Sequence, residues 1–213
     1  MHVKCIAIDF DGTLAAFKGG YDGLFAIFSR RGVELAVVKE CYEQTKRGCG
    51  FLITAMTAVV AGRMGCCFDQ QRIECEFKDW LGLSLIPYPD SVVTLAAWQC
   101  QGIPVVILTA GNAEYQTQKV QATRMPHDEL IVVSHEREKS GVVCRLLECY
   151  GPPLILIEDR PSVLDSVREC GFSEDEVFTV RLLRQESPYV RENSVYRHCS
   201  YNTLDEVFLT IES

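Results

Sequence analysis

The residues Ile8-Asp9-Phe10-Asp11-Gly12-Thr13-Leu14 end an apolar run that begins at Val3, and they decide the fold of this chain. The run does not alternate between apolar and polar residues, which is typical of a strand buried on both faces of a parallel sheet. Residues two apart on a strand point the same way, so Asp9 and Asp11 both project from its carboxyl end, where open α/β sheets bind ligands. Two carboxylates this close repel each other unless a cation neutralises them or one stays protonated. The stretch therefore predicts a buried first strand that ends in an acidic site.

Four later apolar runs have the same character and the length of a strand. Together with the first run at residues 3–10, they cover residues 104–109, 129–134, 154–158 and 177–182. Stretches with apolar residues three or four apart lie between the later runs, notably 140–150 and 162–170, and Gly151 and Gly171 mark their ends. Strands that alternate with helices predict an α/β fold with a doubly wound parallel sheet.

A long segment after the first strand interrupts this alternation, because residues 15–86 contain no convincing strand. The segment reads as helices broken at glycines, Gly48 and Gly50 among them, with the helices at residues 21–30, 34–47, 51–61 and 69–81. We therefore predict two domains. The α/β core comprises residues 1–15 and 88–213, and residues 16–87 form a small all-helical insertion after the first strand.

The rest of the core carries two further expectations. Asp90 follows a Pro-Tyr-Pro sequence and is expected to cap a helix that runs to about Cys100. Residues 185–200 are polar and show no periodic pattern, so no element is expected there. A last helix is expected at residues 204–211.

The composition is that of an ordinary globular protein, since 23% of the 213 residues are charged and 47% are hydrophobic. The formal net charge of −8 disfavours a nucleic-acid partner, which usually requires a basic face. No run approaches the ~20 apolar residues that cross a bilayer, and no signal-peptide pattern is seen at the N-terminus. The 11 cysteines form no CxxC pair, which favours reduced, mostly buried thiols over a metal site. We expect a cytoplasmic protein without a membrane partner.

The run Asp9–Leu14 resembles the first motif of the haloacid dehalogenase superfamily of phosphohydrolases. The other three motifs of that family have counterparts here in the same order, each at a strand end or just before a helix: Thr109-Ala110, Lys139 and Glu158-Asp159. The resemblance covers about residues 1–15 and 88–182. It implies a Rossmann-like core and makes the helical insertion a cap of the C1 type, placed over the site so that small substrates are favoured.

The resemblance also implies chemical roles. Asp9 would attack phosphorus as the nucleophile and form an aspartyl-phosphate, and Asp11 would act as general acid and then general base. Mg²⁺ would bind Asp9, the backbone carbonyl of Asp11, and Asp159. Glu158 stands where many relatives carry another residue, and it is expected to reach the metal only through water.

The remaining implied roles concern the phosphate. Thr109 and the amide of Ala110 would hold phosphoryl oxygens, and Lys139 would neutralise both Asp9 and the phosphate. Lys119, in the middle of the helix after the second strand, is the alternative for the lysine role. Lys139 could instead be a solvated surface charge, and Thr109 taken alone would be interpreted as an ordinary strand-end residue. Asp165 lies six residues after Asp159, further than the spacing often seen for the third acid of the family, so whether it touches the metal stays open.

The function expected from these residues is Mg²⁺-dependent hydrolysis of a small phosphorylated metabolite. A phosphomutase of the same superfamily uses the same residues and stays open as an alternative, as does a non-catalytic binding protein with this fold. A haloacid dehalogenase fits less well, because members of that branch need neither the second acid nor the metal. The substrate and the oligomeric state are not determined by the sequence.

Overall fold

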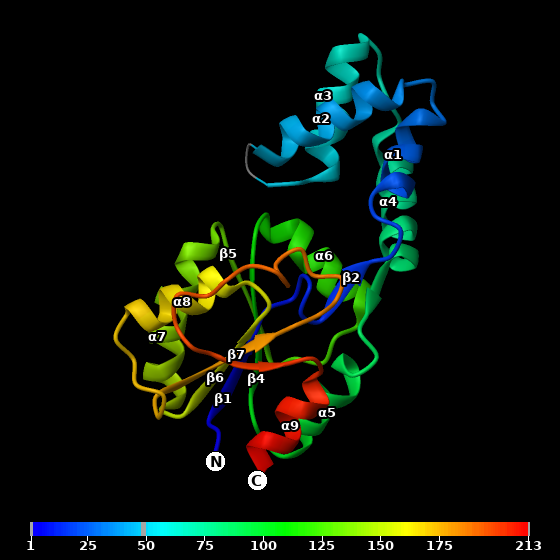
Figure 1. Cartoon of the computed structure of the whole chain (residues 1–213). Helices are drawn as coiled ribbons and strands as arrows, with labels where there is room; N and C mark the ends of the chain where they lie inside the picture. Colours follow the sequence, from blue (N-terminus) through cyan, green and yellow to red (C-terminus); the bar gives the residue numbers. More distant parts are fainter. Residues whose placement is uncertain (1, 48–49, 213) are drawn as a thin grey trace. The chain divides into compact units, whose positions relative to one another are not determined.

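The computed structural model describes residues 2–47 and 50–212, so the predicted break at Gly48 lies outside the described residues. The chain divides into two compact units, which Figure 1 shows in sequence colours. One unit combines Met1–Ala16, Pro87–Ala110 and Arg124–Ser213, and the other combines Phe17–Ile86 and Gly111–Thr123. The second unit thus contains the segment that we predicted as the insertion, with bounds one residue shorter at each end. It also contains Gly111–Thr123, which we had placed in the core.

The first unit, called the α/β unit below, is built on a six-stranded sheet in which every pairing is parallel. The strand order is β5-β4-β1-β6-β7-β8, so the first strand of the chain lies between two strands made much later. The strands are β1 (Cys5–Ile8), β4 (Val105–Ala110), β5 (Glu129–Val133), β6 (Leu154–Glu158), β7 (Val177–Leu182) and β8 (Cys199–Tyr201). The predicted doubly wound parallel sheet is confirmed.

Helices cover both faces of this sheet because its central strands are apolar throughout. All residues of β1 and β6 are buried, as are the first five of β4. On one face, α7 (Lys139–Tyr150) packs against β1, β4 and β6, and α8 (Pro161–Glu169) packs against β6 and β7. The helices α5 (Ser91–Cys100) and α9 (Leu204–Glu212) lie side by side away from α7 and α8 (Figure 1). A short 3-10 turn, η1 (Glu136–Glu138), leads into α7.

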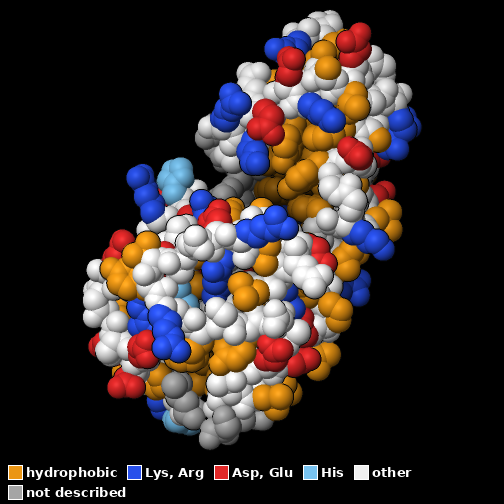
Figure 2. Space-filling model, in the orientation of Figure 1, with side chains coloured by type: hydrophobic (Ala, Val, Ile, Leu, Met, Phe, Trp, Pro, Cys, Tyr) orange, Lys and Arg blue, Asp and Glu red, His pale blue; other side chains and the backbone are white. Residues whose placement is uncertain are grey.

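The second unit, called the helical unit below, is held together by an aromatic core. Its helices are α1 (Asp22–Ser29), α2 (Leu35–Arg47), α3 (Ile53–Met64), α4 (Gln70–Ser84) and α6 (Ala113–Thr123). Phe17 stacks on Trp80 with ring centroids 5.1 Å apart, and Phe51 contacts the ring of Tyr115 of α6 at 4.8 Å. On the visible face of this unit, hydrophobic side chains gather between charged ones of both signs (Figure 2).

Three sequence expectations are wrong in detail. Residues 15–86 do contain strands, since β2 (Ala15–Phe17) pairs with β3 (Leu85–Pro87), and residues 185–200 include the start of β8. These strands have three residues each, too few to produce an apolar pattern. Asp90 precedes α5 but makes no capping bond to that helix, because its carboxylate binds the guanidinium of Arg184 instead.

Among the described residues, no helix is long and apolar enough to cross a membrane.

Candidate active site

The candidate site lies at the carboxyl ends of three neighbouring strands of the α/β unit. Ile8 of β1 pairs with Ile107 of β4 and with Ile157 of β6. The residues that follow these pairs therefore leave the sheet side by side. They are Asp9 and Asp11 after β1, Thr109 and Ala110 at the end of β4, and Glu158 and Asp159 at the end of β6. This is the end of an open parallel sheet at which ligands bind.

Lys139 is the centre of the site, although it is the first residue of a helix and its side chain is only 1% exposed. Its ammonium nitrogen Nζ lies 2.6 Å from Asp9 Oδ1 and 2.8 Å from Glu158 Oε2. The carboxylate of Glu136, one turn earlier, lies 3.0 Å from the same nitrogen. A buried lysine is tolerated only with such partners, because an unpaired charge in the interior costs several kcal/mol. The predicted lysine thus meets the predicted nucleophile.

Burial and mutual repulsion raise the pKa values of the acids at this site. Burial raises the pKa of Asp9 well above its usual range, the charge of Glu158 adds to this, and Lys139 opposes it. Burial likewise raises the pKa of Glu158 to about 8, again against the effect of Lys139. The pKa of Asp159 rises to about 6 through burial and the charge of Asp9. Burial alone would lower the pKa of Lys139, but the surrounding carboxylates hold it well above its usual value. One lysine therefore does not neutralise this cluster.

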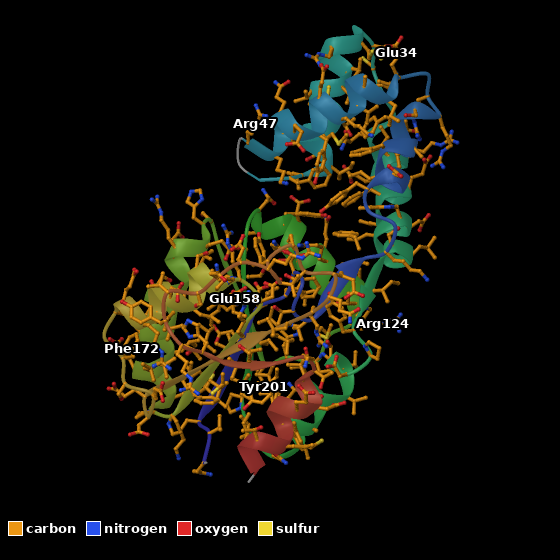
Figure 3. All side chains as sticks on the ribbon, in the orientation of Figure 1. Glu34, Arg47, Arg124, Glu158, Phe172 and Tyr201 are labelled. Carbon is orange, nitrogen blue, oxygen red and sulfur yellow. The ribbon has the colours of Figure 1, made fainter. Side chains whose placement is uncertain are left out.

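The donor set fits a hard divalent cation. Asp9, Glu158 and Asp159 each offer a carboxylate oxygen, and the three oxygens lie within 4.8 Å of one another. All three residues are buried, and Figure 3 marks Glu158 inside the α/β unit. Mg²⁺ prefers such oxygen ligands, and its two positive charges would offset both the cost of burying these carboxylates and their mutual repulsion, which together raise the pKa values.

Asp159 is confined by two neighbours that fix its carboxylate. Gly12 has a φ of 78°, and a Cβ at this position would overlap Oδ2 of Asp159. Ser187 Oγ donates a hydrogen bond of 2.5 Å to the same oxygen. Only a glycine combines this backbone angle with room for the carboxylate, so the Asp-Gly step that ends the first motif has a steric reason as well as a conformational one.

The remaining candidate residues lie in different parts of the fold. Asp11 lies near enough for its charge to raise the pKa of Asp9, and Thr109 is buried at the neighbouring strand end. Lys119, the alternative lysine, is a residue of α6 in the helical unit, and its nitrogen lies 5.0 Å from the ring centroid of Tyr115. Asp165 uses its carboxylate elsewhere, on residues 194–198.

Two residues of the site were missed by sequence reasoning. Ser187 comes from the segment that we read as patternless, and its contact with Asp159 joins residues 28 apart in the chain. No local signal in the sequence indicates such a contact. Glu136 could have been found, because it precedes Lys139 by three residues and so faces it across one helical turn.

Comparisons with known proteins agree with this geometry. The family model for haloacid dehalogenase-like hydrolases matches residues 6–180. No curated protein matches the sequence. Among solved structures, a protein described as a haloacid dehalogenase-like hydrolase from Burkholderia xenovorans LB400 is similar with a TM-score of 0.73 and 14% identity, over 98% of this chain and 96% of that one.

Two further solved structures show how widely the fold is used. The L-2-haloacid dehalogenase PA0810 is similar with a TM-score of 0.60 and 15% identity, over 98% of this chain and 99% of that one. A predicted phosphoglycolate phosphatase from Haemophilus somnus 129pt has a TM-score of 0.58 and 15% identity, over 100% of this chain and 99% of that one. At such identities the similarity shows the fold and leaves the substrate to be argued from the site.

Proposed function

Because the chain belongs to the haloacid dehalogenase-like hydrolase family, we propose that it is a Mg²⁺-dependent phosphatase that hydrolyses a small phosphorylated metabolite. The observation that carries this proposal is the buried cluster in which Lys139 contacts Asp9 and Glu158 beside Asp159. The cluster combines a carboxylate nucleophile, a fixed cation and ligands for a second cation, which is what transfer of an anionic phosphoryl group requires.

Asp9 is the proposed nucleophile. Its carboxylate oxygen attacks phosphorus, the bond to the leaving alcohol breaks, and an aspartyl-phosphate forms on Asp9. Lys139 holds one oxygen of Asp9 at 2.6 Å, so it orients the carboxylate and offsets negative charge as the phosphoryl group approaches. Thr109 and the amide of Ala110, at the end of the neighbouring strand, are the proposed contacts for phosphoryl oxygens.

Asp11 is the proposed acid and base. The leaving group of a phosphoester is an alkoxide, which is a poor leaving group until it receives a proton. Asp11 supplies that proton in the first step. In the second step it takes a proton from the water that hydrolyses the aspartyl-phosphate, which restores both carboxyl groups to their starting states. It is less buried than Asp9, which suits a group that exchanges protons.

The metal ligands proposed in this chain are Asp9, the backbone carbonyl of Asp11, and Asp159, with Glu158 nearby. Bound Mg²⁺ would neutralise the clustered carboxylates and shield the charge on the phosphoryl oxygens. Asp9 and Lys139 are both buried, which favours a small substrate that can enter a narrow site over a phosphorylated protein.

The same site argues against dehalogenation as the main reaction. A halide leaves without being protonated, so a dehalogenase has no use for an acid at Asp11. Dehalogenation would use Asp9 as its nucleophile but gives Glu158 and Asp159 no role, whereas a divalent cation and a phosphoryl group together use all three buried carboxylates. A phosphomutase remains the second candidate, since it would use the same residues and return the phosphoryl group to the substrate.

The test is release of inorganic phosphate from a panel of small phosphoesters, with and without Mg²⁺. Sugar phosphates, nucleotides and phosphoglycolate form the panel, and chloride release from 2-chloropropionate is measured beside it. We expect Mg²⁺-dependent phosphate release that falls by about 10³-fold or more in Asp9→Asn, because the variant lacks the nucleophile.

Asp175→Asn is the matched control, since Asp175 is an exposed acid outside the site. It should leave the rate unchanged. Chloride release without phosphate release would contradict the proposal in favour of a dehalogenase. Conversion of one sugar phosphate isomer into another, without release, would favour the mutase.

A further inference from the structure

The segment between β7 and β8 crosses the end of the sheet at which the candidate site lies. This segment, residues 183–198, is called the strap below, and it is the orange stretch above the sheet in Figure 1. It belongs to the α/β unit, as do all the acids of the site and Lys139. The strap has no regular secondary structure, so its position depends on side chains that hold it at several points.

Buried charged groups fix the strap at its start. Arg184 forms a two-pronged ion pair with Asp90, at 2.9 and 2.8 Å, and both side chains are less than a tenth exposed. The same guanidinium contacts the carbonyl of Thr13 at 3.3 Å, in the loop that carries Asp9 and Asp11. Asp90 also accepts a hydrogen bond from the backbone N–H of Leu204. Bidentate pairs of this kind impose a fixed geometry. The start of the strap is therefore tied to the loop of the first motif.

The middle of the strap is fixed from the neighbouring strand. The guanidinium of Arg181, a residue of β7, donates hydrogen bonds to the carbonyls of Tyr189 at 2.9 Å and Glu192 at 2.7 Å. The ring of Tyr189 in turn lies 4.9 Å from the guanidinium carbon of Arg160, the residue after Asp159. Ser187 lies between the two anchored regions and is itself only 4% exposed.

The hydroxyl of Ser187 has its single proton directed at Asp159. A serine hydroxyl carries one proton and two lone pairs. The backbone N–H of Tyr189 donates to Ser187 Oγ at 3.1 Å, which occupies a lone pair. The hydroxyl proton is then free to form the hydrogen bond that Ser187 Oγ donates to Asp159 Oδ2, 2.5 Å away. A hydrogen bond received by a hydroxyl strengthens the one that it donates. Ser187 is thus a fixed donor to this carboxylate.

We propose that Ser187 is a positioning residue, which holds the carboxylate of Asp159 in the orientation that binds the divalent cation. This inference rests on the proposed function, because it assumes that Asp159 is a metal ligand. The carboxylate lies against Gly12 on one side and Ser187 on the other, and Ser187 donates a hydrogen bond to its Oδ2. Groups that orient a metal ligand in this way typically change metal affinity by about 10- to 100-fold when removed.

The test compares Mg²⁺ binding by the full-length chain and its variants, using calorimetry and the Mg²⁺ dependence of the melting temperature. Ser187→Ala should weaken Mg²⁺ binding by about tenfold or more. Ser187→Cys should weaken it as well, because a thiol of nearly the same size is a poor donor. Ser187→Thr, which keeps a hydroxyl, should recover most of the affinity. If either Ser187→Ala or Ser187→Cys fails to fold, the other variant still provides the test.

The matched control is Ser194→Ala. Ser194 lies in the same strap and also donates to a carboxylate, that of Asp165 at 2.7 Å, but outside the site. It should bind Mg²⁺ as the wild type does. In turnover assays, Ser187→Ala should need more Mg²⁺ for half-maximal rate and should recover much of the rate when Mg²⁺ is saturating. A purely structural role would lower the melting temperature without changing this Mg²⁺ dependence.

Two outcomes would overturn the inference, and they differ from each other. Wild-type affinity for Mg²⁺ in folded Ser187→Ala or Ser187→Cys would contradict the role of Ser187 alone. Failure of the wild type to bind Mg²⁺ would contradict the metal site itself, and with it both this inference and the proposed function.

Discussion

Gly12 and Asp159 lie so close together that a residue with a side chain would not fit at position 12. The φ of 78° at Gly12 lies in the left-handed region, and Oδ2 of Asp159 fills the space that a side chain would need. The glycine of the first motif therefore has two separate functions. It allows the turn after β1, and it lets a carboxylate from β6 approach the backbone of the loop that carries the nucleophile.

Substituting Gly12 by alanine should affect the site far more than the fold. We expect a loss of about 1–2 kcal/mol in the free energy of unfolding from the strained backbone angle, in addition to displacement of Asp159. Gly102→Ala is the matched control, because Gly102 has a similar φ of 74° and open space where its Cβ would lie. Urea denaturation should show both variants destabilised, whereas only Gly12→Ala should lose Mg²⁺ binding and phosphate release. Equal activity in the two variants would contradict the steric role.

Site residues could be predicted where a local sequence pattern marks them, and could not be predicted where only a contact between residues distant in the sequence does so. Asp9 and Asp11 were visible because their spacing on one strand is local information, and the order of the motifs brought Lys139 and Asp159 into the same hypothesis. The structure places Asp9, Lys139 and Asp159 together. Ser187 could not be found in this way, because a polar loop residue gives no sign of the distant carboxylate that it contacts.

Hydrogen bonds with individual side chains hold the strap in place. Asp165, on α8, accepts hydrogen bonds at 2.7–3.0 Å from Ser194, Val195, Tyr196 and His198. These bonds hold the pKa of Asp165 at about 2, even though burial alone would raise it. The residue that the sequence left without a role is therefore the anchor for the end of the strap.

The depressed pKa of Asp165 makes part of the stability depend on pH. The folded pKa of about 2 lies below the ordinary value of about 3.9, so the ionised carboxylate stabilises the folded state at neutral pH. The contribution, about 2 kcal/mol, is present above pH 4 and is lost as the pH falls toward 2. Urea denaturation at a series of pH values should show Asp165→Asn less stable than the wild type at pH 6, with a difference that shrinks in acid. A difference that stays constant with pH would contradict the anchor.

Among the elements, the sequence predicted the strands that are buried on both faces of the sheet and missed the short strands that are not. The five long strands are continuously apolar because helices cover both faces of the sheet, and all five were found. The three-residue strands β2, β3 and β8 lie at edges or in a separate ribbon and leave no such pattern. Asp90 was predicted as a helix cap from local preference, but the distant Arg184 competes for the same carboxylate and binds it.

Across the whole molecule, the cysteines divide by exposure. Cys5 and Cys41 are buried, and burial raises the pKa of Cys5 to about 12. The exposed ones are Cys66, Cys67, Cys75, Cys100, Cys149, Cys170 and Cys199. The expectation of mostly buried thiols is therefore wrong, and the ten cysteines that the structure describes are all free.

This distribution predicts a pattern of alkylation. Brief treatment of the folded protein with iodoacetamide should label the exposed cysteines and spare Cys5 and Cys41, because both of these thiols are buried away from the reagent. Peptide mass mapping reads out each site, and the same treatment in denaturant should label all 11 cysteines. Rapid labelling of Cys5 in the folded protein would contradict the burial of β1.

The place of β1 in the sheet also bears on how the protein is made. Ile6 pairs with Val105 and with Ile155, so the first strand to leave the ribosome must wait for partners encoded far downstream. At ordinary rates of translation the wait is on the order of 10 s, during which an apolar segment has no sheet to join. Most of the helical unit, Phe17–Ile86, is synthesised within that interval. A nascent chain that stalls before β4 therefore leaves the apolar residues of β1 without a partner strand, and such exposed segments are prone to aggregate.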